Sequence, residues 1–424
     1  MKKKLAIISS YNESCGNASY TEVLKREFEK VYDVDVLPLQ IDLLESNKSN
    51  VVKIADNHIK DIANKLIAYD YVNIQFEAGL YGSSRANIIR RVKMLIKASN
   101  NLIVTMHRID VGESLFDKNV VKRILSGNIL KNLKIFRQST YMPKLYAEII
   151  RYVKKYSTKR NMNIIVHTKR DKKVVQRIFG FNNVYDFPLT FLNSEQRKRK
   201  RIESEKESFL NKYNLSNNDV VIGLFGFISE YKGHETAIKS LKLLPPNYKV
   251  IVFGSQHPMS IQNYTAIDSY LNKLLELIEE NSVSFKETVY KKIDNIDNLK
   301  SSFDRRVIFA GNLDDDDFIN ALYCCDFAVL PYMEVNQSGS GIASLVLESK
   351  IKSLYSNSKA FLELSKYYPN TFERFDIGNY NELAYKLQNY NHDYNDNIDK
   401  AINKYNLENN IKFHISIFEG TINE

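Results

Sequence analysis

The sequence predicts an α/β protein with two Rossmann-like domains, whose parallel sheets face a central cleft. Two observations support this prediction. Short apolar runs alternate with amphipathic helical patterns, and the alternation starts again after a polar, charged segment at residues 193–208. At 424 residues, the chain is also long enough for about two domains, each with a core of its own.

The first half contains six apolar runs that we interpret as strands. They cover residues 5–9, 34–37, 71–76, 102–106, 163–167 and 184–187. Helical patterns separate several of these runs. Residues 20–31 have apolar side chains at Val23, Leu24, Phe28 and Val31, and a second pattern covers residues 84–98. Strands separated by helices indicate right-handed crossovers within a parallel sheet.

The same order of elements returns in the second half. Four further runs are interpreted as strands, at residues 220–225, 249–253, 307–310 and 327–330. A helix is expected at residues 234–244, between the first two of them. The repetition predicts a second parallel sheet, with its loops at the carboxyl ends of the strands.

These patterns give the expected domain limits. The first domain is expected at residues 1–195, followed by a polar linker at 196–215. The second domain is expected at 216–395, with a helical insertion at about 259–303. Residues 396–424 are expected to form a C-terminal helix, which is a candidate to cross back to the first domain.

Charge divides the chain into two unlike halves. Residues 1–200 hold 37 lysines and arginines against 19 acidic residues, a net charge of +18, and residues 201–424 hold 23 against 31, a net charge of −8. The basic half is expected to meet an anionic partner, with a membrane surface favoured. The densest basic run, 197–201, is either part of that contact or an ordinary solvated linker. Nucleic acid is not expected, because its usual binding motifs are missing.

Several features point to the cytoplasm. No apolar stretch approaches the roughly 20 residues of a membrane-spanning helix, and the run at residues 5–8 is too short for a signal peptide. Cys15, Cys324 and Cys325 have neither metal-ligand spacing nor a disulfide pattern. We therefore expect a cytoplasmic protein, peripheral at the inner face of the plasma membrane if its basic half binds lipid.

The most informative segment runs from Arg306 to Glu348. It reads as strand, acidic loop, helix, strand and then a small-residue turn that leads into a helix carrying Glu348. The turn contains Ser338, Gly339, Ser340 and Gly341. Free backbone N–H groups at a helix start favour an anion such as a phosphate.

Two other loops have related features. One leads into a helix through Gly16 and Asn17, and glycine permits a tight turn there. The G-x-G-x-x-G spacing of dinucleotide sites is not present in it. The other covers residues 226–233, follows a strand and places Lys232 at a helix start.

Polar residues also follow two strands of the first half. Gln75 and Glu77 accompany the third strand, and His107 and Arg108 follow the fourth. Strand ends of open parallel sheets line ligand sites. The acidic run at residues 314–317 is interpreted as a helix N-terminus, because consecutive aspartates cannot converge on one ion. No metal site is predicted.

These motifs resemble the GT-B glycosyltransferases of retaining family 4, and the chain looks like a divergent bacterial member. Residues 226–233 read G-F-I-S-E-Y-K-G, where many members read G-R-x-x-x-x-K-G. Eight residues before Glu348 stands Ser340, where members commonly have a second glutamate. Residues 75–82 are similar to a Q-x-E-x-G-x-(Y/F)-G stretch of bacterial relatives.

The resemblance implies a role for each candidate residue. Lys232 stabilises the departing nucleotide, and His107 hydrogen-bonds the donor sugar. Glu348 binds the ribose, while Gln75, Glu77 and Arg108 are candidates for the acceptor or the sugar. The donor diphosphate and sugar are bound by Lys232 and by the loop residues Gly16, Asn17, Ser338, Gly339, Ser340 and Gly341.

The implied reaction transfers a sugar from a nucleoside diphosphate sugar to a hydroxyl of a glycan, lipid-linked or protein acceptor. It retains the anomeric configuration and uses neither a metal nor a cofactor, and the nucleobase is open. Phe227 and Ser340 leave room for other functions. One is a degenerate GT-B protein that binds nucleotide sugar or scaffolds a transferase. Another is a nucleotide-sugar epimerase or hydrolase, or a phosphorylase.

Overall fold

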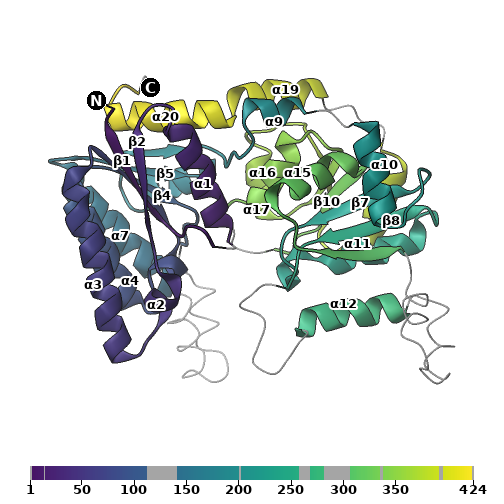
Figure 1. Cartoon of the computed structure of the whole chain (residues 1–424), viewed down its shortest axis with the longest axis horizontal. Helices are drawn as coiled ribbons and strands as arrows, with labels where there is room; N and C mark the ends of the chain where they lie inside the picture. Colours follow the sequence, from purple (N-terminus) through teal and green to yellow (C-terminus); the bar gives the residue numbers. More distant parts are fainter. Residues whose placement is uncertain are drawn as a thin grey trace. The chain divides into compact units, whose positions relative to one another are not determined.

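The computed structural model describes residues 2–13, 15–111, 141–199, 202–256, 268–280, 306–334, 338–390 and 395–422. Its contacts divide the chain into two units, coloured along the sequence in Figure 1. Unit 1 comprises Met1–Phe191 and Tyr405–Glu424, and unit 2 comprises Leu192–Lys404. Most of the expected insertion at 259–303 lies outside the described residues.

Unit 1 contains a six-stranded parallel sheet with the strand order β2-β1-β3-β4-β5-β6. Its strands are β1 (Lys4–Ser9), β2 (Asp33–Pro38), β3 (Tyr71–Phe76), β4 (Asn101–Met106), β5 (Asn161–Val166) and β6 (Val184–Asp186). All six were predicted as strands, because buried parallel strands are continuous apolar runs. β2 and β3 lie on opposite sides of β1, so the order reverses between β1 and β3.

Helices cover both faces of this sheet. They are α1 (Gly16–Phe28), α2 (Ile41–Glu45), α3 (Ser49–Lys65), α4 (Arg85–Ala98), α7 (Tyr141–Ser157), α8 (Lys169–Arg177) and α20 (Leu407–Glu419), with 3₁₀ turns η1 (Leu66–Ala68) and η2 (Ala78–Tyr81). The apolar faces of α3, α4 and α7 share a core with Ala6, Val72, Ile74 and other strand residues. α20 packs on α1 and β4 (Figure 1). Its Phe418 stacks on Tyr71 of β3.

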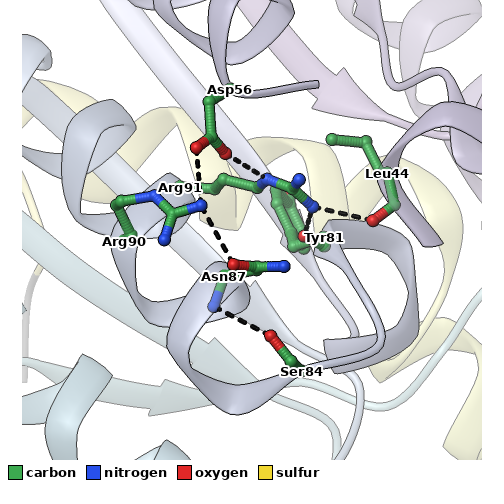
Figure 2. A network of polar contacts seen from close by, with 7 residues as sticks. All are labelled: Leu44, Asp56, Tyr81, Ser84, Asn87, Arg90 and Arg91. Atoms are coloured by element: carbon green, nitrogen blue, oxygen red, sulfur yellow. Dashed lines mark hydrogen bonds and ion pairs between the residues drawn. The ribbon is translucent and has the colours of Figure 1, made fainter. Parts of the chain in front are cut away.

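A buried arginine, Arg91, forms hydrogen bonds that connect the turn after β3 to helices α2 and α3. Arg91 of α4 is fully buried and donates from Nε to Asp56 of α3 at 2.8 Å (Figure 2). Its Nη1 donates to the carbonyl oxygens of Leu44 at 2.7 Å and Tyr81 at 2.9 Å. One guanidinium therefore connects α2, α3 and η2, because it has several donors in a rigid plane.

Unit 2 contains a second six-stranded parallel sheet, with the order β12-β11-β10-β7-β8-β9. Its strands are β7 (Val220–Phe225), β8 (Tyr248–Phe253), β9 (Val307–Gly311), β10 (Phe327–Leu330), β11 (Ser353–Ser356) and β12 (Glu373–Phe375). The first four were predicted from the sequence. Here the order reverses between β7 and β10, which lie side by side.

The helices of unit 2 also cover both faces of its sheet. They are α9 (Ser194–Lys198), α10 (Glu203–Lys212), α11 (His234–Ser240), α12 (Ser269–Glu280), α15 (Asp315–Cys324), α16 (Gly341–Glu348), α17 (Lys359–Leu364), α18 (Tyr380–Gln388) and α19 (Asn395–Lys404), with 3₁₀ turns η3 (Glu230–Lys232) and η4 (Leu241–Leu243). α11, α12 and α18 share one core with the sheet. Phe209 of α10 and Phe318 of α15 contact the aromatic pair Phe225 and Phe253 of the strands.

Three expectations differ from the structure. The segment expected as a linker, 196–215, is largely helical, and Phe209 and Leu210 of α10 are buried in unit 2. The expected C-terminal helix is two helices, of which α19 belongs to unit 2 and α20 to unit 1. The first helix starts at Gly16 rather than residue 20, because the Cys15 side chain caps it, and it ends before Val31, which is exposed.

Among the described residues, no helix is both long enough and apolar enough to span a bilayer.

Candidate functional site

The centre of the candidate site in unit 2 is the reversal of strand order between β7 and β10. The loops after these strands leave the same edge of the sheet, at its carboxyl end. Open parallel sheets bind their ligands at this point. The loop after β7 carries Lys232, and the loop after β10 leads to Ser340.

The two loops are in direct contact. Gly233 has a left-handed backbone, with φ of +65°, and a Cβ atom there would lie 2.1 Å from the carbonyl oxygen of Pro331. The N–H of Met333 also donates to the carbonyl of Tyr231 at 2.8 Å. Glycine at 233 therefore has a structural reason, since any side chain would collide with the end of β10.

Lys232 is a buried cation with no carboxylate partner among the residues that the structure describes. The residue is 5 % exposed, and its ammonium donates to the Tyr332 hydroxyl and lies 4.3 Å from the centre of that ring. Among the described residues, none forms an ion pair with it, and burial lowers its pKa. An unbalanced positive charge at a ligand-binding edge favours an anion.

Ser340 connects the small-residue loop to the same group. Its hydroxyl lies 3.3 Å from that of Tyr332 and accepts a 3.3 Å bond from Ala343 N, which caps α16. Ser338 is buried and Gly339 is partly buried, while Gly341 starts the helix. The structure thus connects Lys232 and Ser340 through Tyr332, which the sequence analysis missed. Its one signal was a hydroxyl-bearing residue two positions after a predicted strand.

Glu348 lies at the other end of α16. It is fully buried, and its Oε2 accepts a 3.0 Å hydrogen bond from Leu192 N. Eight residues of helical rise separate it from Ser340 by about 12 Å. The carboxylate is therefore not part of the Lys232 group, and its ribose role stays a prediction.

Two other residues near this edge add no charge to it. Phe227, which stands where the G-R-x-x-x-x-K-G motif has arginine, is partly buried and has no polar side-chain atom. Glu334 accepts a hydrogen bond from Lys359 N at 3.2 Å and lies 3.9 Å from the Lys359 ammonium. Glu334 is thus bound to α17, away from Lys232.

The acidic run at 314–317 forms the start of α15, as expected. The Asp314 side chain accepts from Asp317 N at 2.8 Å and caps the helix. Within the described part of the chain, no group of three or more His, Cys, Asp or Glu side chains is placed to hold a metal ion.

In unit 1, the reversal of strand order brings the loops after β1 and β3 together. The Asn17 amide donates to Glu77 at 2.5 Å, and Glu77 is exposed. Gly16 is exposed, and a Cβ atom there would contact nothing within 4 Å. The sequence-based reason for this glycine, a tight turn, was therefore wrong, because its backbone does not have a positive φ.

A row of polar side chains follows the carboxyl ends of β3, β4 and β5. Gln75 Oε1 lies 2.8 Å from His107 Nε2, and His107 Nδ1 lies 3.3 Å from His167 Nε2. His167 Nδ1 lies 3.1 Å from the carbonyl oxygen of Phe187, after β6. Burial lowers the pKa of His107 to about 4 and also lowers that of His167, so both rings are neutral at pH 7.

This row changes how three of the candidates can act. Both ring nitrogens of His107 already contact protein atoms, although the residue is partly exposed. Gln75 is fully buried, so its amide orients His107 and is not presented to solvent. Arg108 donates to Asp110 at 2.9 Å, which neutralises part of its charge. Glu77 is the most exposed of these candidates.

The basic run at 197–201 serves the fold of unit 2. Arg197 donates to the carbonyl of Leu192, and Arg199 pairs with Glu205 at 3.0 Å and contacts Asn320. Residues 200 and 201 lie outside the described part. The described arginines of this run therefore hold the α9 region and do not form a free patch.

Comparisons with solved structures decide the fold. HepE (Alr3699) of Anabaena, in complex with UDP and glucose, matches 99 % of this chain and 100 % of its own, with a TM-score of 0.62 and 12 % identity. Sucrose-phosphate synthase of Thermosynechococcus elongatus matches over 99 % of both chains, with a TM-score of 0.65 and 12 % identity. The fold is that of the GT-B glycosyltransferases.

A glycosyltransferase of Rickettsia africae is similar at a TM-score of 0.61 and 15 % identity, over 99 % of both chains. No protein-family model matches the sequence, and no curated protein matches it significantly. The GT-B fold predicted from the sequence is thereby confirmed, with one parallel six-stranded sheet in each unit.

Proposed function

We propose that the chain is a glycosyltransferase that moves a sugar from a nucleoside diphosphate sugar to an acceptor hydroxyl. The observation that carries the proposal is the buried ammonium of Lys232, which has no carboxylate partner in the described part of the chain and lies at the reversal of strand order in unit 2. A nucleoside diphosphate supplies the negative charge that this position favours, and the first turn of α16 adds backbone N–H groups. Structures of HepE, a solved GT-B neighbour, contain UDP and UDP-glucose, so UDP is the first nucleotide to test.

The proposed chemistry requires charge stabilisation on the leaving group. The bond between the anomeric carbon and the diphosphate oxygen breaks, and the electron pair stays on that oxygen. The acceptor oxygen attacks from the same face, which retains the configuration, and its proton passes to the departing phosphate. Lys232 offsets the developing negative charge, and no metal or cofactor is assigned. Glu348 is proposed for the ribose and Glu77 for the acceptor or the sugar.

A nucleotide screen tests the donor site. We expect UDP, GDP, ADP or CMP, or one of their common sugars, to raise the melting temperature of the protein. Ligand at 100 times its Kd stabilises by about 2.7 kcal/mol, which is easily measured. The Glu348→Ala variant should lose the shift with the nucleotide that works. No shift with any compound would favour the alternative of a scaffold protein with a degenerate site, for which Phe227 and Ser340 are the supporting residues.

Turnover separates the transferase from the other enzymes of this fold. Donor consumption that depends on an added glycan, lipid-linked or protein acceptor would support the transferase. Donor consumption in water alone would instead indicate a hydrolase, and conversion to an isomeric nucleotide sugar an epimerase. Sugar release from a glycan by inorganic phosphate would indicate a phosphorylase.

We also propose that the basic unit 1 contacts an anionic membrane surface, at the cytoplasmic face. The exposed side of α7 carries Lys144, Arg151, Lys154 and Lys155, while Leu145, Ile149 and Val153 face the core. This helix is a better candidate than the run at 197–201, whose described arginines are engaged within unit 2.

Charge reversal on α7 tests the membrane proposal. The Lys154→Glu/Lys155→Glu variant should bind phosphatidylglycerol vesicles at least tenfold more weakly, since each basic residue near such a surface contributes about 1 kcal/mol. The control is Lys53→Glu/Lys60→Glu on α3, which makes the same change in net charge at exposed positions of the same unit. Equal losses in both variants would show that only net charge matters, and no loss in either would remove the membrane contact.

A further inference from the structure

We propose that Tyr332 is a positioning residue of the candidate anion site, whose hydroxyl holds the Lys232 ammonium beside Ser340. The inference rests on the proposed nucleotide-sugar site and assigns it a residue that neither the sequence motifs nor the comparisons indicate. It follows from three features of unit 2: the surroundings of the ammonium, the way the phenol is fixed and the direction of the hydrogen bonds.

The first feature is the aromatic surroundings of the ammonium, which interacts with two tyrosines, Tyr332 and Tyr231. The Lys232 side chain reaches into the fold over Gly226, where a Cβ atom would lie 3.1 Å from Nζ. Within the described residues it has no carboxylate partner, and it donates to the Tyr332 hydroxyl and also interacts with the Tyr231 side chain. The Tyr332 ring is the nearer of the two, at 4.3 Å from the ammonium against 5.5 Å for Tyr231.

The second feature is the rigidity of Tyr332. It is 2 % exposed, its ring packs against Phe361 with a centroid distance of 4.9 Å, and it meets Tyr231 edge-on at 5.7 Å. Its carbonyl oxygen accepts a 2.6 Å hydrogen bond from the Ser356 hydroxyl of β11. Because ring and backbone are both held, the hydroxyl is a fixed point for Lys232.

The third feature is the direction of the hydrogen bonds. The phenol accepts from the ammonium, which leaves its own O–H free to donate to Ser340, 3.3 Å away, or to a ligand oxygen. Burial raises the pKa of the phenol, so the proton stays in place. Lys232, Tyr332 and Ser340 thus place three donors from three segments at one edge, where Phe227 supplies none.

The test compares two substitutions that each remove one buried tyrosine hydroxyl. Tyr332→Phe keeps the ring and removes the contact to Lys232. Tyr355→Phe is the matched control, because Tyr355 is also fully buried in unit 2 and donates to the Ala343 carbonyl at 3.1 Å, not to Lys232. Melting temperatures of the ligand-free variants show whether both fold.

Isothermal titration calorimetry then measures the affinities of wild type and both variants for the diphosphates UDP, GDP and ADP and for the monophosphates UMP, GMP and AMP. We expect Tyr332→Phe to lower the diphosphate-to-monophosphate affinity ratio about tenfold, the effect of one charge-assisted hydrogen bond. Tyr355→Phe should leave the ratio within about twofold. A general structural defect would weaken both nucleotides alike and leave the ratio unchanged.

The outcomes separate the two proposals. If wild type binds none of the three diphosphates, the proposed donor site is wrong, and the role of Tyr332 is wrong with it. If wild type binds a diphosphate through Lys232 but Tyr332→Phe keeps the wild-type ratio, only the positioning role is overturned. A lowered ratio in both tyrosine variants would also overturn it, since Tyr355 does not contact Lys232.

Discussion

Replacing Lys232 by methionine is expected to lower kcat/KM for sugar transfer by about 10²–10³-fold, because the departing diphosphate loses its buried positive charge. Steady-state kinetics with the donor found in the nucleotide screen measure the effect. Lys242→Met, at an exposed position of the same unit, is the control and should be near wild type. Equal activity of the two variants would contradict the role of Lys232.

The same variant should be at least as stable as wild type at pH 7. Burial lowers the Lys232 pKa from its ordinary value of 10.5, so the folded chain holds this proton less tightly than the unfolded chain. The destabilisation is therefore complete below the folded-state pKa and vanishes as the pH rises past 10.5. Methionine at position 232 removes this destabilisation, because it carries no charge, and it fills most of the volume of the lysine side chain. A lower melting temperature for Lys232→Met at pH 7 would show that the ammonium stabilises the fold instead.

Gly233→Ala is expected to destabilise unit 2 strongly, by more than about 3 kcal/mol. The substitution combines backbone strain at a positive φ with a collision, because its Cβ atom would lie 2.1 Å from the Pro331 carbonyl oxygen. For a unit of this size, that corresponds to a drop of roughly 6–12 °C in melting temperature, measured by circular dichroism.

Gly378→Ala is the matched control for this experiment. Gly378 also has a positive φ, of +74°, but a Cβ atom there would meet nothing within 4 Å. Gly378→Ala should lower the free energy of unfolding by only about 1–2 kcal/mol, because it adds only the strain of the left-handed backbone. If the two variants melt at the same temperature, the contact between the Lys232 loop and the end of β10 is looser than the structure indicates.

Local sequence patterns were sufficient to predict most of the strands. Ten strands were found because each is a short apolar run between polar segments, as buried parallel strands are. β11 and β12 were missed: Ser353–Ser356 is half serine, and Glu373–Phe375 has three residues and one apolar side chain. The segment at 196–215 was expected as a linker because charge dominates its composition, whereas the buried Phe209 and Leu210 hold it in unit 2.

Some residues of the candidate site are recognisable from local sequence patterns, and others only from tertiary contacts. Lys232, Ser340 and the loop at 338–341 were proposed as candidates from local features, namely a lysine after a strand and small residues before a helix. Tyr332 was not found, because its contact with Lys232 joins positions 100 residues apart. His167 was not named as a candidate, yet it contacts His107 directly. The basic run at 197–201 likewise gave no sign that Arg199 forms hydrogen bonds with Glu205 and Asn320.

The sequence by itself determined the α/β class, the two parallel sheets and the segments that carry the candidate anion site. These properties depend on the periodicity and composition of neighbouring residues, which a single chain displays directly. Only the tertiary structure decided that Tyr332 holds Lys232, that Glu348 lies away from it against Leu192, and that α20 belongs to unit 1. Such contacts depend on strand order and helix packing, which bring distant residues together and leave no local pattern in the sequence.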